Sequence, residues 1–205
     1  MPRRRLEIIL AGFGGQGVMV MGQLLAYAAM SRGLEVTWMP SYGPEQRGGT
    51  ANCTVVISPG DIASPIVARP HVAVVMNTPS FDKFEPRVVP HGVLLVNSSL
   101  VPERSFRTDI DVFYVPAVEV AMKLGNEKMA NIVMVGALAA STGVLPREPL
   151  LAELTHFFQG DKARLLEGNR RALRQGFNLI PKQDRHPQFF EFAAGPAVKA
   201  DAGAP

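Results

Sequence analysis

The sequence has very little cysteine: Cys53 is the single one among 205 residues. One cysteine cannot form an internal disulfide bond, and it cannot by itself hold an iron–sulfur cluster, which normally takes four thiolates. Cys53 lies in a strand-like apolar run, residues 50–57. A small residue buried in a strand is therefore favoured over a nucleophile. The scarcity of thiols excludes a cluster that this chain holds alone.

Strong charge and long apolar runs are also lacking. The net charge is +3 and aromatic residues make up 7%, so the basic, aromatic-interleaved patch of a nucleic-acid-binding protein is missing. Residues 1–5 are basic, but the apolar run after them stops at glycines, without the cleavage pattern of a signal peptide. The apolar segment 18–30 is too short to be a good membrane span. We expect a cytoplasmic protein that binds neither nucleic acid nor membranes.

A glycine-rich turn is the most informative stretch that is present. It reads Gly12-Phe-Gly-Gly-Gln-Gly17, between a strand-like segment at 6–11 and a helix-like segment at 18–30. Its spacing fits G-x-G-x-x-G, and a strand-to-helix turn offers backbone N–H groups at the positive end of a helix. The turn indicates a ligand site. The alternative is a turn that only lets strand and helix pack closely.

The fingerprint of a dinucleotide-binding fold is incomplete. Such a fold carries an acidic residue about 20 positions on, at the carboxyl end of the second strand, which holds the ribose. The strand-like run 35–39 has Glu35 as its only acid, at its amino end, and Met39 and Pro40 follow at the other end. The pattern therefore predicts a docked ligand more firmly than it predicts NAD.

The alternation of strand-like and helix-like runs predicts an α/β fold, a three-layer Rossmann-like domain whose largely parallel sheet has helices on both faces. We expect this single domain to cover residues 1–180, followed by a loose tail at 181–205. Asp161 is the expected N-cap of the last helix. Strands are expected at 6–11, 35–39, 50–57, 71–76, 92–97 and 111–115, and helices at 18–30, 79–84, 117–123, 129–140, 149–158 and 161–175.

Two of these helices, 18–30 and 129–140, have almost no polar face. A helix that is apolar all round is buried on more than one side. It is either the central helix of one large core or a helix whose second face meets another subunit. At this chain length we expect the second arrangement.

The loop at 40–50 follows the carboxyl end of a strand, so it is expected on the same rim of the sheet as the glycine turn. There Arg47 precedes two glycines whose N–H groups can form an anion-binding nest, and a guanidinium suits a phosphate or carboxylate. The alternative is that Arg47 pairs with Glu45 or with another subunit. We predict no catalytic and no metal-ligating residue; the candidate cofactor-binding residues are Gly14, Gly15, Gln16, Gly17, Ser41, Tyr42, Arg47, Gly48 and Gly49.

Three stretches together resemble one family: the turn at 12–17, the segment from Ser41-Tyr-Gly-Pro through Cys53, and Asn131-Ile-Val-Met-Val-Gly136. In their order and spacing the chain, over roughly residues 6–178, is similar to the gamma subunit of 2-oxoacid:ferredoxin oxidoreductases. That subunit is also seen as an internal domain of single-chain pyruvate enzymes. Gln46 stands where Met is expected in many relatives.

The resemblance implies a reaction. A 2-oxoacid is decarboxylated on thiamine diphosphate, electrons pass through iron–sulfur clusters to ferredoxin, and coenzyme A takes the acyl group. This sequence has one Cys and no convincing Gly-Asp-Gly…Asn thiamine segment. The resemblance therefore implies that thiamine diphosphate, magnesium and the clusters lie on sister subunits of a hetero-oligomer.

Within that oxidoreductase, this subunit is expected to act as a scaffold that contacts coenzyme A, and to be inactive when isolated. A free-standing nucleotide-binding Rossmann-like protein and a pure assembly module are the alternatives. The 2-oxoacid itself stays open among 2-oxoglutarate, pyruvate and branched-chain acids.

Overall fold

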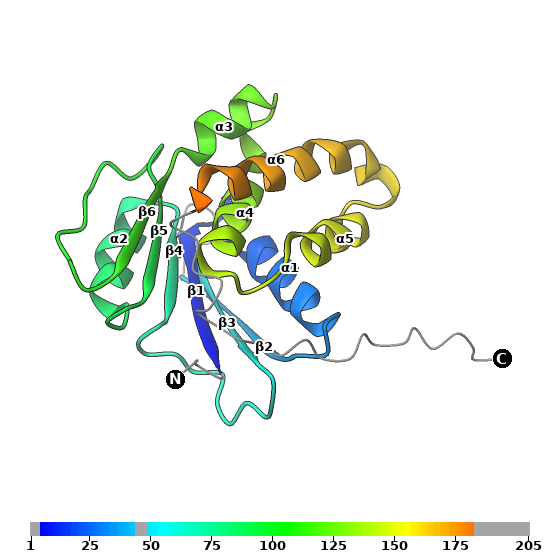
Figure 1. Cartoon of the computed structure of the whole chain (residues 1–205). Coiled ribbons are helices and arrows are strands. Elements are labelled where there is room, and N and C mark those ends of the chain that lie inside the picture. Colours follow the sequence, from blue (N-terminus) through cyan, green and yellow to red (C-terminus); the bar gives the residue numbers. More distant parts are fainter. Residues whose placement is uncertain (1–4, 44–48, 183–205) are drawn as a thin grey trace.

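A six-stranded sheet forms the centre of the computed structural model, which describes residues 5–43 and 49–182 (Figure 1). The strand order is β2-β3-β1-β4-β5-β6. Strands β1, β4, β5 and β6 run parallel, whereas β3 is antiparallel to both β1 and β2. The bounds are β1 Leu6–Phe13, β2 Glu35–Tyr42, β3 Thr50–Ser58, β4 Val72–Val75, β5 Val93–Asn97 and β6 Asp111–Val115.

Helices cover both faces of this sheet, but unequally (Figure 1). The larger layer packs on the core that contains Leu10 and Leu95, and the smaller one packs Phe81 and Phe84 against Ile9 on the other side. The predicted three-layer α/β fold is therefore confirmed. The larger layer holds α1 Val18–Met30, α3 Ala117–Lys123, α4 Ala130–Thr142, α5 Arg147–Phe157 and α6 Leu166–Leu179, and the smaller one holds α2 Thr78–Phe84 with the 3-10 turn η1 Glu85–Arg87.

The central strands are apolar along their whole length because both of their faces are covered. Every residue of β4 and of β5 is buried. In β1, Leu10 lies opposite Cys53 of β3 on one side and Val74 of β4 on the other. Continuous apolar runs are typical of strands enclosed between two helical layers.

Strand β2 is longer than the sequence predicted, since it continues through Pro40 to Tyr42 instead of ending at Met39. β2 is one of the two edge strands of the sheet. Proline, which lacks an N–H group, is tolerated on an edge strand because one side of that strand pairs with nothing. The expectation that residues 40–42 belong to a loop was therefore wrong.

The expected cap of the last helix was also wrong. Asp161 lies inside a 3-10 turn, η3 Gly160–Leu165, and α6 begins only at Leu166. Helix α2 is capped by Asn77, whose side chain accepts a hydrogen bond from the Ser80 N–H at 2.9 Å.

The two apolar helices bury their surfaces within this chain. All residues of α4 are buried, and α1 packs against the sheet on one side and against α4 and α5 on the other. Of α1, only Tyr27 and Met30 are more than half exposed, at 51% and 54%. The alternative of one large core is thus correct for α4, whereas contact of α1 with another subunit through its half-exposed Tyr27 and Met30 stays a prediction.

Helices α4 and α6 approach each other backbone to backbone. A Cβ atom at Gly136 would lie 2.2 Å from the Leu173 carbonyl oxygen, and one at Gly176 would lie 1.9 Å from the Val133 carbonyl oxygen. Only glycine fits at two such positions. Across the parts of the chain that the structure describes, no helix is both long enough and apolar enough to cross a membrane.

Candidate functional site

The connections leave the carboxyl ends of β1 and β4 toward opposite faces of the sheet. β1 continues into α1 in the larger helical layer, whereas β4 continues into α2 in the smaller one (Figure 1). The two strands are neighbours in the sheet. In open α/β sheets, ligands bind in the crevice that such a divergence leaves outside the carboxyl ends of the strands.

The glycine turn lies at this divergence, and its shape depends on glycine. Gly15 and Gly17 have φ angles of 96° and 74°, a left-handed conformation that side chains disfavour. Gly17 occupies the N-cap position of α1. A Cβ atom there would lie 2.3 Å from Nδ2 of Asn131, while one at Gly15 would meet nothing within 4 Å. The turn is therefore packed against α4 on one side and open on the other.

The side chain of Gln16 stabilises the glycine turn through hydrogen bonds. Its Oε1 accepts a hydrogen bond from the Phe13 N–H at 2.7 Å, and its Nε2 donates to the Met76 carbonyl at 3.3 Å. Asn77 Nδ2 donates to the same Oε1 at 3.5 Å. Gln16 was predicted to contact a ligand, and its polar atoms are engaged in joining the turn after β1 to the segment after β4.

The two predicted loops meet on one rim, as expected. The Gly14 N–H donates to the Gly49 carbonyl at 3.0 Å. Ser41 and Tyr42 lie apart from the turn, at the end of the edge strand, where the Tyr42 side chain is 67% exposed. The predictions for Arg47 and Gly48 fall outside the described residues.

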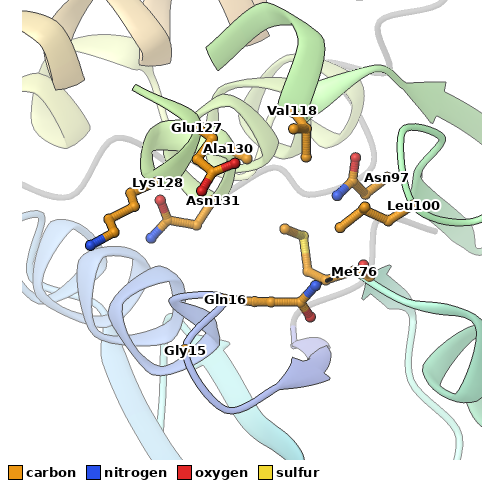
Figure 2. A pocket seen from close by; sticks show the side chains of 10 residues that line it. All are labelled: Gly15, Gln16, Met76, Asn97, Leu100, Val118, Glu127, Lys128, Ala130 and Asn131. Atoms are coloured by element: carbon orange, nitrogen blue, oxygen red, sulfur yellow. Dashed lines mark hydrogen bonds between the residues drawn. The ribbon is translucent and has the colours of Figure 1, made fainter. Parts of the chain in front are cut away.

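A cavity of about 300 Å³ lies beside the turn (Figure 2). It is bounded by the segments after β1 and β4, the end of β5, α3, and the start of α4. Two of its residues, Gly15 and Gln16, were predicted from the sequence. The other residues that line it were not predicted as site residues: Met76, Asn97, Leu100, Val118, Glu127, Lys128, Ala130 and Asn131.

Asn131 connects the start of α4 to the glycine turn. Its Nδ2 donates to the Gly17 carbonyl at 3.4 Å, and its Oδ1 accepts from the Ile132 N–H at 2.9 Å. Two sequence stretches, 12–17 and 131–136, are thus adjacent in space although more than a hundred residues separate them. The motif that begins at Asn131 was a signal in the sequence that could have placed this residue in the site.

Comparison with known proteins is consistent with this arrangement. The profile of the pyruvate ferredoxin/flavodoxin oxidoreductase family matches residues 7–179. The chain belongs to this family.

Relatives within the family are named as oxidoreductase or synthase subunits. Ketoisovalerate oxidoreductase subunit VorA of Methanothermobacter thermautotrophicus is 42% identical over 176 residues, which are 85% of this chain and 36% of that protein. The 2-oxoglutarate synthase subunit KorC of Methanocaldococcus jannaschii is 35% identical over 151 residues, 72% of this chain and 81% of that protein. The chain spans about a third of the length of the VorA relatives.

Solved structures in the family share the fold. The keto/oxoacid ferredoxin oxidoreductase gamma subunit from Geobacter sulfurreducens has a TM-score of 0.74 and 31% identity, covering 85% of this chain and 97% of that chain. A 2-oxoglutarate:ferredoxin oxidoreductase from Magnetococcus marinus has a TM-score of 0.83 over 96% of this chain and 34% of that chain, at 21% identity. At that identity the likeness concerns the fold alone.

Iron–sulfur chemistry, which the family name suggests, does not fit the residues of this chain. Cys53 is fully buried in β3, and its Sγ donates to the Val18 carbonyl at 3.5 Å. Burial raises the pKa of the Cys53 thiol to about 12. A thiol of this kind stays protonated and inert at neutral pH, so the interpretation of Cys53 as a structural core residue is supported.

Proposed function

We propose that this chain is the gamma-type subunit of a multi-subunit 2-oxoacid:ferredoxin oxidoreductase, which converts a 2-oxoacid and coenzyme A to an acyl-CoA, or carries out the reverse reaction. The match to the family over residues 7–179 is the observation that supports this most directly. Relatives named for ketoisovalerate, 2-oxoglutarate and pyruvate all align with the chain. The proposal therefore leaves the 2-oxoacid open.

In this proposal, thiamine diphosphate, magnesium and the iron–sulfur clusters lie on sister subunits, and ferredoxin meets the complex there. The buried Cys53, with its raised pKa, argues against a cluster on this chain. The chain contributes a rigid α/β scaffold and the rim where its glycine turn and the loop after β2 meet. We expect the complex to work in the cytoplasm.

We further propose that this rim contacts coenzyme A. The Gly14–Gly49 hydrogen bond joins the glycine turn to Gly49, which follows Arg47 by two residues in the sequence. The turn precedes α1, whose positive end favours an anion. Arg47 and the glycines after it add a guanidinium and further N–H groups suited to a phosphate. The alternative, in which Arg47 pairs with a sister subunit, makes the chain a pure assembly module.

The proposed function is tested by comparing the isolated chain with the complex. Purified alone, the chain should be colourless and should not oxidise 2-oxoacids. The assembled complex should reduce ferredoxin only when both a 2-oxoacid and coenzyme A are present. An iron–sulfur absorption band from the pure chain, or 2-oxoacid oxidation by it, would contradict the proposal.

A further inference from the structure

The stretch formed by the turn η3, helix α6 and the residues just after it is strongly basic. Residues 161–182 contain two acidic residues, Asp161 and Glu167, against six cationic ones, a surplus of four positive charges, whereas the whole chain has a surplus of three. The positive charge of the protein is therefore concentrated in this stretch. Its cationic residues are Lys162, Arg164, Arg170, Arg171, Arg174 and Lys182.

Helix α6 has two distinct sides. The inner side packs on α4, so α6 lies on the outside of the larger helical layer (Figure 1). Arg171 and Arg174 are exposed and three residues apart, so they share the opposite side. Lys162 and Arg164 are exposed in η3, directly before the helix. We call these four residues the basic face. The buried residues of the inner side are Asn169, Ala172, Leu173 and Gly176.

The side chains of the basic face have no acidic partner among the residues that the structure describes. No carboxylate there lies within 4.0 Å of their charged nitrogens, although Glu167 is only one helical turn before Arg171. Elsewhere in the chain Arg107 is paired with Asp109 at 2.7 Å. The cations of the basic face are thus available to carboxylates of another molecule.

Arginine predominates on this face, since Lys162 is its one lysine. Lysine suffices on a surface that meets only water. Arginine is enriched and lysine depleted in protein–protein interfaces, and the planar guanidinium binds a carboxylate through two hydrogen bonds. Leu165, which is 37% exposed, adds apolar surface next to Arg164. This composition favours contact with another protein over a solvated surface.

We propose that the basic face docks on an acidic surface of a sister subunit. The inference rests on the proposed function, which supplies the sister subunits, and it adds the surface of this chain that meets one of them. Arg164 and Arg174 are ten residues apart, a distance of about 15 Å along a helix. A single small anion does not span that distance, so the partner presents several carboxylates in a row.

A membrane and a nucleic acid fit the basic face less well than a protein does. An amphipathic helix binds a membrane by inserting its apolar side into the lipid, but the apolar side of α6 is packed on α4. Nucleic-acid surfaces interleave aromatic residues with cations, and the exposed residues of α6 include no aromatic one. Asp161 and Glu167 lie among the cations, so the complementary surface carries mixed charge, as a protein does and a row of phosphates does not.

Quantitative affinity purification from the native host tests the surface in the assembled complex. Arg171→Glu/Arg174→Glu, produced as the tagged chain, should retain roughly tenfold less of its sister chains than the wild type, because each change replaces an attraction by a repulsion. The isolated variant should melt close to the wild type, since both positions are exposed. Lys83→Glu/Arg87→Glu is the matched control, with the same change of charge at exposed positions of the smaller helical layer. It should retain the sister chains normally.

Cross-linking of the wild-type complex gives a measurement that needs no variant. A carbodiimide joins an amine directly to a carboxylate in contact with it. Mass spectrometry should therefore find Lys162 linked to an Asp or Glu of a sister chain, and Lys83 without such a link.

The outcomes separate this inference from the proposed function. Sister chains that co-elute equally with both double variants, together with an unlinked Lys162, would overturn the docking surface and leave the proposed function standing. A wild-type chain that elutes alone would contradict the proposed function and this inference with it. Phosphatidylglycerol vesicles or single-stranded DNA that the full chain binds and Arg171→Glu/Arg174→Glu does not would assign the basic face to a membrane or a nucleic acid, and would also overturn the proposal.

Discussion

Cys53 is a residue whose chemistry follows from its surroundings. A Cβ atom at Gly22 of α1 would lie 2.5 Å from its Sγ and 2.6 Å from Nε1 of Trp38, so helix, thiol and indole are packed without a gap. Burial is the largest cause that raises the pKa of this thiol, from 9.0 to about 12. Ionisation of the folded chain is therefore disfavoured, whereas the unfolded chain ionises freely.

This difference predicts how stability depends on pH. Above about pH 9 the unfolded state loses the Cys53 proton and the folded state keeps it, so the free energy of unfolding should fall between about pH 9 and pH 12. The slope from this group is at most about 1.4 kcal/mol per pH unit. Chemical denaturation at pH 7, 9 and 10 measures it. A Cys53→Ala variant lacks this component, and equal pH dependence in the two proteins would contradict the account.

Substitution of Arg47 tests whether this chain contacts coenzyme A. If it holds a phosphate, the Arg47→Ala variant of the assembled complex should show an apparent KM for coenzyme A that is about 10- to 100-fold higher, since a hydrogen bond to a charged group contributes roughly 1.5–3 kcal/mol. The KM for the 2-oxoacid should change little. Steady-state kinetics on size-selected complex, with each substrate varied in turn, gives both values. An unchanged KM for coenzyme A together with a lower yield of complex would favour the assembly-module alternative.

The residues of the site differ in how far the sequence could predict them. Gly14, Gly15 and Gly17 were predicted from the glycine-rich turn between a strand-like and a helix-like run, and of these Gly15 and Gly17 adopt left-handed φ angles. Asn97 was missed because its place in the cavity wall is a property of the tertiary structure, and nothing local distinguishes it from any polar residue that ends a buried strand. Gln16 was predicted, but its engagement with Met76 depends on how β1 and β4 pair.

The apolar helices α1 and α4 show that a hydrophobic pattern predicts the burial of a helix but not the elements that bury it. The sequence pattern predicted that both helices are buried on several sides, but it did not predict which elements pack against them. The structure supplies the covering elements from within the chain: the sheet, α5 and α6. Ala26→Arg, at a site only 7% exposed, is therefore expected to harm folding of the chain itself and does not test an interface.

The α4–α6 contact gives a prediction about stability. Gly176→Ala should lower the free energy of unfolding by about 1–3 kcal/mol or more, because the added methyl group meets the Val133 backbone and cannot be accommodated by a side-chain rotation. Gly168→Ala is the matched control in the same helix, where the new Cβ would lie 3.0 Å from the flexible Met129 sulfur. That variant should be neutral or slightly stabilising, since alanine favours helix. Equal effects of the two substitutions in urea denaturation would contradict the close approach.

At the scale of the whole molecule, the order of strands was harder to predict than their existence. All six strand-like runs were found from their apolar residues, yet periodicity does not reveal that β3 runs antiparallel to both β1 and β2. The shared rim was nevertheless predicted correctly, because β2 still runs in the same direction as β1. The domain boundary near residue 180 stays a prediction, since the residues after 182 are not described.

In the proposed function, this chain works as one subunit of a larger oxidoreductase. Affinity purification of the tagged chain from its native host, followed by mass spectrometry of the co-eluting proteins, tests it most directly. We expect larger thiamine- and cluster-bearing chains to co-elute, and the eluate to reduce ferredoxin with a 2-oxoacid and coenzyme A. A chain that elutes alone and binds NAD would contradict it.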